Sequence, residues 1–199
     1  MRPLLVTALL ALGGVAHAEP TAPHGYAGAK LGGIAPLDGL SPFATVGVEV
    51  AYVLPAASHH VAVGLVVDYT QPTTRGTEMD PRVTGGSYTW QLTERELGVM
   101  PVVLYRARPM GTITPYAGIG PRLLLTRSTV EDDGAPTIEA TEEVSTEFGF
   151  GVPVGGELPL GPGRLTGELL LQYGTLDHTA TGDSHAGAVS LALGYRMIL

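Results

Sequence analysis

Residues 43–54 read Phe-Ala-Thr-Val-Gly-Val-Glu-Val-Ala-Tyr-Val-Leu, and their side chains alternate in polarity. Val46 and Val48 fall on one face of this stretch, whereas Thr45 and Glu49 fall on the other. Successive side chains of a β-strand point to opposite faces, so the pattern predicts a strand with one apolar face and one small or polar face.

The same two-residue period recurs along most of the chain, and no segment reads better with the period of a helix. Turn residues such as Gly, Pro and Asp separate the segments. The pattern predicts eight strands, over residues 25–35, 43–54, 60–70, 88–106, 112–127, 146–158, 164–175 and 187–197. Evenly spaced strands without helices indicate a sandwich or a barrel.

The lengths of the links between these segments favour the barrel. Three links are about five residues long, and most of those that alternate with them are longer. The short links are 55–59, 107–111 and 159–163, and the others are 36–42, 71–87, 128–145 and 176–186. Outer-membrane barrels have short periplasmic turns and longer external loops. We therefore predict an all-β fold, an eight-stranded antiparallel up-and-down transmembrane β-barrel.

In each predicted strand one register is apolar and uncharged, and we expect it to face lipid. Tyrosines recur near the strand ends on this register, as an aromatic girdle requires: Tyr52, Tyr69, Tyr105, Tyr173 and Tyr195. The opposite register is small or polar, and a soluble sheet would show the same pattern on the face that it turns to water. It contains many glycines, however, and small residues suit the inside of a narrow barrel better than an exposed face.

The opposite register also holds the charges that we expect to form a network in the lumen. They are Lys30, Glu49, Asp68, Glu96, Arg106, Arg122, Glu157, Glu168 and Arg196. Because the last two predicted strands are neighbours in a barrel, Arg196 is placed to reach Glu168. We expect this network to close the lumen, with acids in excess.

Three prolines, Pro101, Pro121 and Pro153, lie inside predicted strands. Proline has no backbone N–H, and a closed barrel has no edge at which the missing donor is harmless. We expect bulges or locally missing hydrogen bonds at these positions.

The N-terminal residues 1–18 have the features of a secretory signal peptide. Arg2 gives a positive start, residues 4–15 are apolar, and Ala16-His17-Ala18 fits the small-x-small cleavage pattern. We expect cleavage after Ala18, which leaves 19–199 as one barrel domain; the alternative is an uncleaved anchor.

The composition narrows the class of protein further. The chain has no internal apolar run of about 18 residues, which excludes a bundle of transmembrane helices. The net charge of −8 argues against a nucleic-acid partner. The chain has no cysteine, which excludes disulfides and thiolate metal sites. We expect no cofactor, no bound metal and a monomer.

Three stretches resemble a known superfamily: 115–122 (PYAGIGPR), 148–156 (FGFGVPVGG) and the terminal strand 189–199 (VSLALGYRMIL). They are similar to the small outer-membrane β-barrels of the OmpA/OmpX/OmpW-like group. The resemblance implies outer-membrane lipid and lipopolysaccharide as surroundings and the outer-membrane insertion machinery as a partner. It identifies architecture rather than activity.

Candidate catalytic and metal-binding residues are few. His59 and His60 are adjacent, but neighbouring strand side chains point apart, so we favour a polar turn. His178 and residues 183–185 (Asp-Ser-His) include the components of a hydrolase triad, although they lie in a Gly/Thr-rich loop. The acidic loop 128–145 favours a solvated surface over a Ca²⁺ site, because EF-hand spacing is absent.

The sequence predicts a non-catalytic outer-membrane barrel with a structural or surface-interaction role. A narrow pore or transporter for small solutes is the main alternative, and a lipid-modifying outer-membrane enzyme is a third. Lumen filling separates the first two, because large lumen side chains joined by ion pairs would form a plug.

Overall fold

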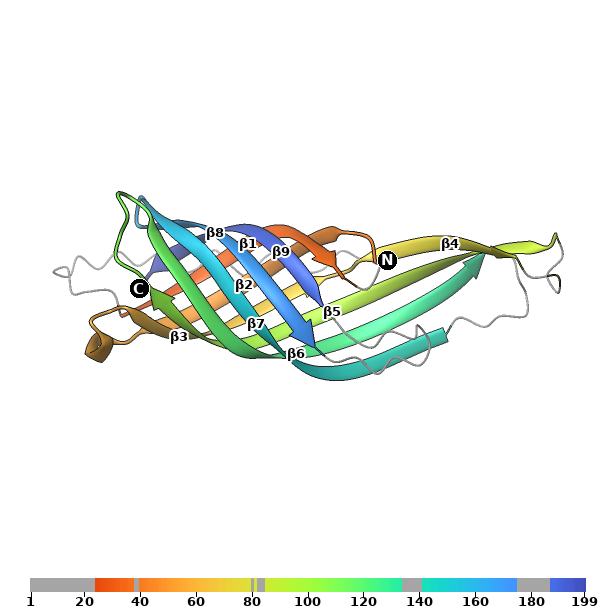
Figure 1. Cartoon of the computed structure of the whole chain (residues 1–199), viewed down its shortest axis with the longest axis horizontal. Coiled ribbons are helices and arrows are strands. Elements are labelled where there is room, and N and C mark those ends of the chain that lie inside the picture. The colour runs from red at the N-terminus through yellow and green to blue at the C-terminus, as the bar shows by residue number, and fades with distance from the viewer. Residues whose placement is uncertain (1–23, 38–39, 80, 82–84, 134–140, 175–186) are drawn as a thin grey trace, which may run out of the picture.

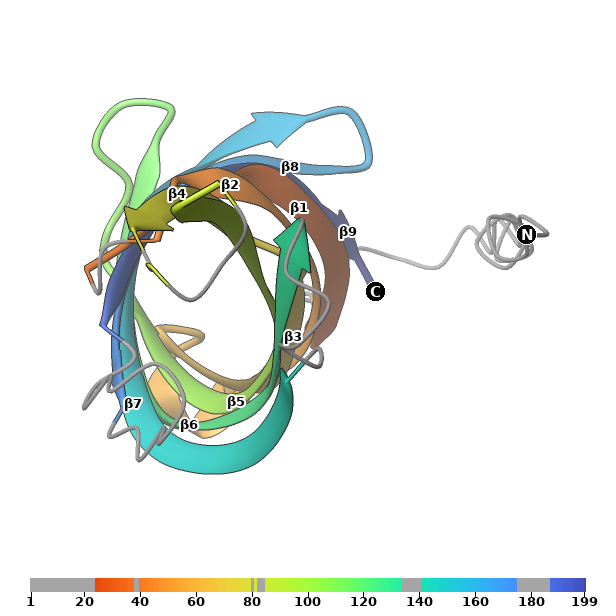
Figure 2. The ribbon, with the colours of Figure 1, turned by 90° about the vertical axis from the view of Figure 1, so that its right-hand side faces the viewer.

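The computed structural model describes residues 24–37, 40–79, 81, 85–133, 141–174 and 187–199, which form a closed antiparallel barrel (Figures 1 and 2). The strands are β1 (Gly25–Pro36), β2 (Phe43–Val53), β3 (Val61–Thr70), β4 (Thr73–Met79), β5 (Ser87–Arg106), β6 (Thr114–Asp133), β7 (Thr141–Leu160), β8 (Gly163–Gly174) and β9 (Ala188–Ile198). A short 3-10 helix, η1 (Pro55–Ala57), follows β2. No helix in the described residues is long and apolar enough to cross a membrane.

Eight of these strands close the ring in the order β3-β2-β1-β9-β8-β7-β6-β5, and β3 then pairs with β5. The eight-stranded antiparallel up-and-down barrel predicted from the sequence is confirmed. Since Tyr26 pairs with Ile198, β1 begins and β9 ends at one end of the barrel, here called the turn end. The opposite end is called the loop end.

β4 is not a ninth barrel strand but a continuation of β3. Thr70 pairs with Glu96 and Thr73 with Thr93, so the offset against β5 is the same on both sides of the intervening proline. The prediction of a loop over 71–87 was therefore wrong. Residues 73–79 and 87 of this stretch belong to a hairpin of β4 and β5 that extends beyond the barrel rim (Figure 1).

The predicted loop 128–145 is also largely strand. β6 pairs with β5 as far as Asp133, and it pairs with β7 as far as Thr141. Strands β4 to β7 thus continue past the loop end as an open sheet (Figure 1). The turn residues at 131–134 suggested a loop, but Glu131, Asp132 and Asp133 pair with residues of β5. The predicted link 176–186 and the predicted signal peptide lie outside the described residues.

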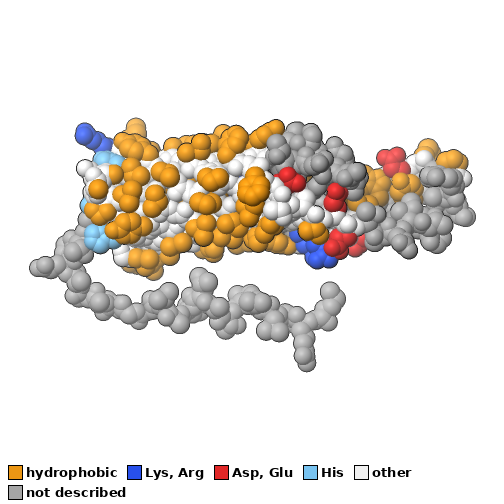
Figure 3. All heavy atoms as spheres, turned by 90° about the horizontal axis from the view of Figure 1, so that it is seen from below, with side chains coloured by type: hydrophobic (Ala, Val, Ile, Leu, Met, Phe, Trp, Pro, Cys, Tyr) orange, Lys and Arg blue, Asp and Glu red, His pale blue; other side chains and the backbone are white. Residues whose placement is uncertain are grey.

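The outer surface of the barrel is apolar. Val48 is 47% exposed and Leu191 is 65% exposed, and both lie on the register expected to face outward. Figure 3 shows hydrophobic side chains covering the barrel flank, with charged side chains gathered toward its two ends. Tyr52 and Tyr105 are exposed near the turn end, and Tyr69 and Tyr173 are exposed toward the loop end.

The three prolines interrupt the ladder without shifting its register. β5 and β6 pair on both sides of Pro101 and Pro121 but not at the prolines, and the offset is unchanged across the gap. A shorter gap between β6 and β7 lies beside Pro153. Each proline keeps its pairing with the strand on its other side. Of the two expected outcomes, the structure has missing pairs and not bulges.

Candidate functional site

The inward register places all nine predicted lumen residues inside the barrel. Their side chains are at most 11% exposed, and the Arg122 side chain is fully buried. Together with Arg164 and Gln172, they form two clusters. The Arg196 cluster lies nearer the turn end and contains Lys30, Glu49, Arg106, Glu157, Arg164, Glu168 and Arg196. The Arg122 cluster lies nearer the loop end and contains Asp68, Glu96, Arg122 and Gln172.

Arg196, on β9, makes ion pairs with three acids of the first cluster. Its Nε and Nη2 donate to the two carboxylate oxygens of Glu49 at 2.6 and 3.0 Å. Its Nη1 donates to Glu157 at 2.7 Å, and its Nη2 lies 3.6 Å from Glu168. A guanidinium that faces a carboxylate with two donors forms the strongest kind of protein ion pair. Arg196 therefore joins strands β2, β7 and β8 through the lumen.

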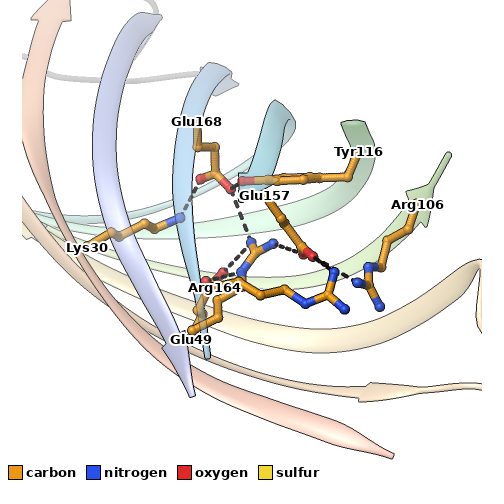
Figure 4. Close-up of polar contacts among 8 residues, drawn as sticks. Lys30, Glu49, Arg106, Tyr116, Glu157, Arg164 and Glu168 are labelled. Carbon is orange, nitrogen blue, oxygen red and sulfur yellow. Dashed lines mark hydrogen bonds and ion pairs between the residues drawn. The ribbon is translucent and has the colours of Figure 1, made fainter. Parts of the chain in front are cut away.

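The other hydrogen bonds of this cluster are donated to the carboxylates of Glu157 and Glu168 (Figure 4). The Lys30 Nζ donates to Glu168 at 2.5 Å, and the Tyr116 hydroxyl donates to the other oxygen of Glu168 at 2.9 Å. Arg106 and Arg164 each donate to Glu157 at 2.8 Å.

Two tyrosine rings cover the Arg196 guanidinium. Its carbon lies 4.7 Å from the centroid of the Tyr26 ring and 4.5 Å from that of the Tyr116 ring. Cation–π contacts of this length stabilise a charge that has lost its water.

The Arg122 cluster is smaller. Arg122 donates to the two oxygens of Asp68 at 2.8 and 2.5 Å and to Glu96 at 3.2 Å. Gln172 also donates to Glu96, at 3.2 Å. Together the two clusters take side chains from every one of the eight barrel strands.

A glycine lies beneath the main ion pair of each cluster. Gly28 on β1 pairs with Glu49 on one side and with Arg196 on the other. A Cβ at Gly28 would come within 3.1 Å of Glu49 and 3.2 Å of Arg196. The absence of a side chain on the middle strand thus lets charges two strands apart meet.

The second ion pair also passes over a glycine, although Gly98 lies directly opposite Leu124 on β6 and not opposite Arg122. Gly98 on β5 is the partner of Asp68, and a Cβ there would come within 2.2 Å of Arg122 and 2.8 Å of Asp68. The glycines of the inward register therefore accommodate the ion pairs as well as fitting the narrow lumen.

Apolar side chains occupy another part of the lumen. Apolar side chains including Val66, Met100 and Leu104 form a buried core along the wall made by β2, β3 and β5. A cavity of about 20 Å³ lies between the clusters, lined by Lys30 and Asp68 among others, and has room for about one water molecule.

Sequence reasoning missed Arg164, Tyr26, Tyr116 and Gln172. The signal was available, because each lies on the same inward parity as a predicted lumen residue of its own strand. Arg164 changes the charge balance: the contacts join five acids with five bases, so these clusters do not show the expected excess of acid.

The structure adds little support for the candidate metal site at His59 and His60 or for the candidate hydrolase triad. His60 donates one hydrogen bond, from Nδ1 to the Arg106 backbone oxygen at 2.7 Å, and its ring stacks on Tyr105. Within the described residues, no group of three or more His, Asp or Glu side chains is placed to hold a metal ion. His178 and residues 183–185 lie outside the described residues.

Comparison with solved structures shows the fold. Neisserial surface protein A (NspA) matches 88% of this chain and 97% of its own, with 16% identity and a TM-score of 0.51. A major outer membrane protein from Thermus thermophilus matches 87% of this chain and 99% of its own, with 15% identity and a TM-score of 0.51. No family model matches the sequence, and neither does any curated protein. The chain is thus similar in fold to small eight-stranded outer-membrane barrels.

The cluster geometry predicts that Glu168→Ala destabilises the barrel by about 3–5 kcal/mol, because it leaves Lys30 buried without its ion-pair partner. As a control, Glu142→Ala removes an ion pair with Arg127 whose partners are 46% and 51% exposed, and should cost at most about 1 kcal/mol. Urea unfolding in detergent, followed by circular dichroism, measures both. Equal effects would contradict the assigned role of Glu168.

The glycine beneath the second ion pair gives another test. Gly98→Ala should destabilise the barrel by about 1–3 kcal/mol, because the new methyl group displaces the buried Arg122 side chain. Gly167→Ala is the matched control, since a Cβ there meets Leu193 at an ordinary 3.8 Å. The same unfolding assay applies, and a neutral Gly98→Ala would refute the close approach.

Proposed function

We propose that this protein is a non-catalytic integral outer-membrane β-barrel with a closed lumen, whose role is structural or surface-interactive. The observation that carries the proposal is the distribution of polarity. The outer wall is apolar around the barrel, and the charges of the two clusters are inside, each paired with an opposite charge. A barrel built for water has the reverse arrangement, whereas lipid requires this one.

The chain topology supports an orientation in the membrane. The short links and both ends of the barrel chain lie at the turn end, which we assign to the periplasm. The open sheet of β4 to β7 would then project outside the cell and offer a surface to external partners. NspA, one of the proteins of similar fold, is named a surface protein.

The proposed surroundings follow from this placement. Residues 1–18 would direct export and be removed, and the insertion machinery of the outer membrane would then fold residues 19–199 into the bilayer. Outer-membrane lipid and lipopolysaccharide would contact the apolar wall. The barrel ring closes on itself through the pairing of β1 with β9, so the part of the protein proposed to lie in the membrane has no edge for a second copy to cover, which supports a monomer.

An arginine in the apolar wall tests the membrane assignment. Val48→Arg should destabilise the barrel in lipid bilayers by about 2–4 kcal/mol if the residue lies near the midplane. Thr77→Arg is the control, because Thr77 is an exposed residue of β4, beyond the barrel rim. Unfolding in liposomes compares the two variants. Equal tolerance of arginine at both positions would rule out a lipid-facing wall.

The filled lumen predicts little or no ion conductance. Eight strands leave an interior just wide enough for side chains, and here ion pairs and apolar residues occupy it. Single-channel recording in planar bilayers tests this, with an open porin in the same membranes as the positive control. A stable, open, cation-selective channel would support the pore alternative instead.

A further inference from the structure

Two arginines face each other on the outer surface at the edge of the apolar wall. On the β5–β6 ladder the outward pair Leu97 and Leu125 is apolar, and the next outward pair toward the loop end is Arg95 and Arg127. Both arginines are exposed. Directly opposed residues on antiparallel strands have Cβ atoms about 4.5–5.5 Å apart, and like charges in that position repel each other.

The charges near this pair do not resolve the repulsion. Arg127 donates to Glu142 at 2.6 Å, but Glu142 belongs to β7, on the side of β6 away from Arg95. Arg95 has no ion-pair partner among the described residues. The pair as a whole keeps a net positive charge.

The same arrangement occurs inside the barrel, where it shows what such a pair binds. Arg164 and Arg196 are also direct cross-strand partners, on β8 and β9. The carboxylate of Glu157 bridges them: one oxygen lies 2.8 Å from Arg164 and the other 2.7 Å from Arg196. An oxyanion between two opposed guanidiniums thus removes their repulsion. Within the described part of the chain, no carboxylate bridges Arg95 and Arg127.

The position of the outer pair indicates where its anion would come from. Arg95 and Arg127 lie one step beyond the last apolar pair, and Tyr69, the exposed partner of Leu97, lies at the same boundary. The next outward pair, Thr93 and Thr129, adds hydroxyl groups. On the proposed membrane placement, this is the level at which lipid headgroups meet the apolar wall.

We propose that Arg95 and Arg127 bind a phosphate group of lipid A, the membrane anchor of lipopolysaccharide, in the leaflet at the loop end. Guanidinium groups match phosphate oxygens with paired donors, so one phosphate can accept from both arginines. This inference rests on the proposed outer-membrane function and assigns residues to its contact with lipopolysaccharide.

Binding to wild-type protein and three variants tests the site. The purified barrel in phosphate-free neutral detergent is titrated with bisphosphorylated lipid A, and bound lipid is counted by native mass spectrometry. Arg95→Gln and Arg127→Gln should each weaken binding about tenfold. Arg75→Gln is the control, because Arg75 is an exposed arginine of β4 that donates to Gln91 instead. Equal binding by all four proteins would overturn the proposal.

The probes distinguish the possible sources of phosphate. Lipid A stripped of its phosphates should bind wild-type protein as weakly as bisphosphorylated lipid A binds Arg95→Gln, and equal binding of both forms would refute a phosphate site. Inorganic phosphate should compete only at far higher concentration than lipid A. Competition at equal concentration, or equal binding of phosphatidylglycerol, would overturn the assignment to lipid A.

Thermal unfolding gives a second readout, because the two arginines should lower the melting temperature without lipid and increase the stabilisation that lipid A provides. Without lipid, Arg95→Gln should raise the melting temperature, because it removes the repulsion. With lipid A, the melting temperature should rise more for the wild type than for this variant. A lower melting temperature for Arg95→Gln in both conditions would mean a structural role and would overturn the proposal. The Val48→Arg comparison tests the membrane placement separately.

Discussion

Closure of the hydrogen-bond ladder is the constraint from which the other features of this barrel follow. The pairings of β1 with β9 and of β3 with β5 leave no free edge around the ring. In lipid, an unpaired backbone group has no water to bind, so only a closed sheet is stable there. Closure with eight strands also fixes a narrow interior. Every inward side chain must therefore fit the others across the lumen, and the position of each glycine becomes decisive.

The interior charges are stable only as a connected set. Burying a charge is costly, and its partner recovers that cost only with good geometry and further hydrogen bonds. Glu157 illustrates this, because its two oxygens accept from Arg106, Arg164 and Arg196. Acids and bases alternate through the Arg196 cluster, so a substitution at one residue would leave others unpaired. Together with Tyr116, such a network crosses the lumen and ties β1, β2 and β5–β9 together.

The sequence predicted the barrel strands well because the membrane enforces alternation. β5 begins at Ser87, and the pattern predicted residue 88. β4 was missed because Arg75 and Thr77 lie beyond the barrel rim, where neither face has to be apolar and no period can be read. Inward parity identified the lumen charges but not their partners. Arg196 pairs most closely with Glu49, two strands away, because Gly28 lies between them, and that depends on register.

The register of the β5–β6 ladder also bears on how the barrel would sit in a membrane. From Leu97 to Tyr105 the outward residues are apolar, with Arg95 as the next outward residue toward the loop end and the end of β5 just beyond Tyr105. Eight residue steps at about 3.4 Å per residue, tilted by about 40°, give an apolar height of about 21 Å. The side chains at each end extend this span, which brings it close to the apolar band of about 25 Å in outer-membrane barrels. On the proposed membrane placement, Arg95 therefore lies near the edge of the hydrocarbon, at the level of the lipid headgroups.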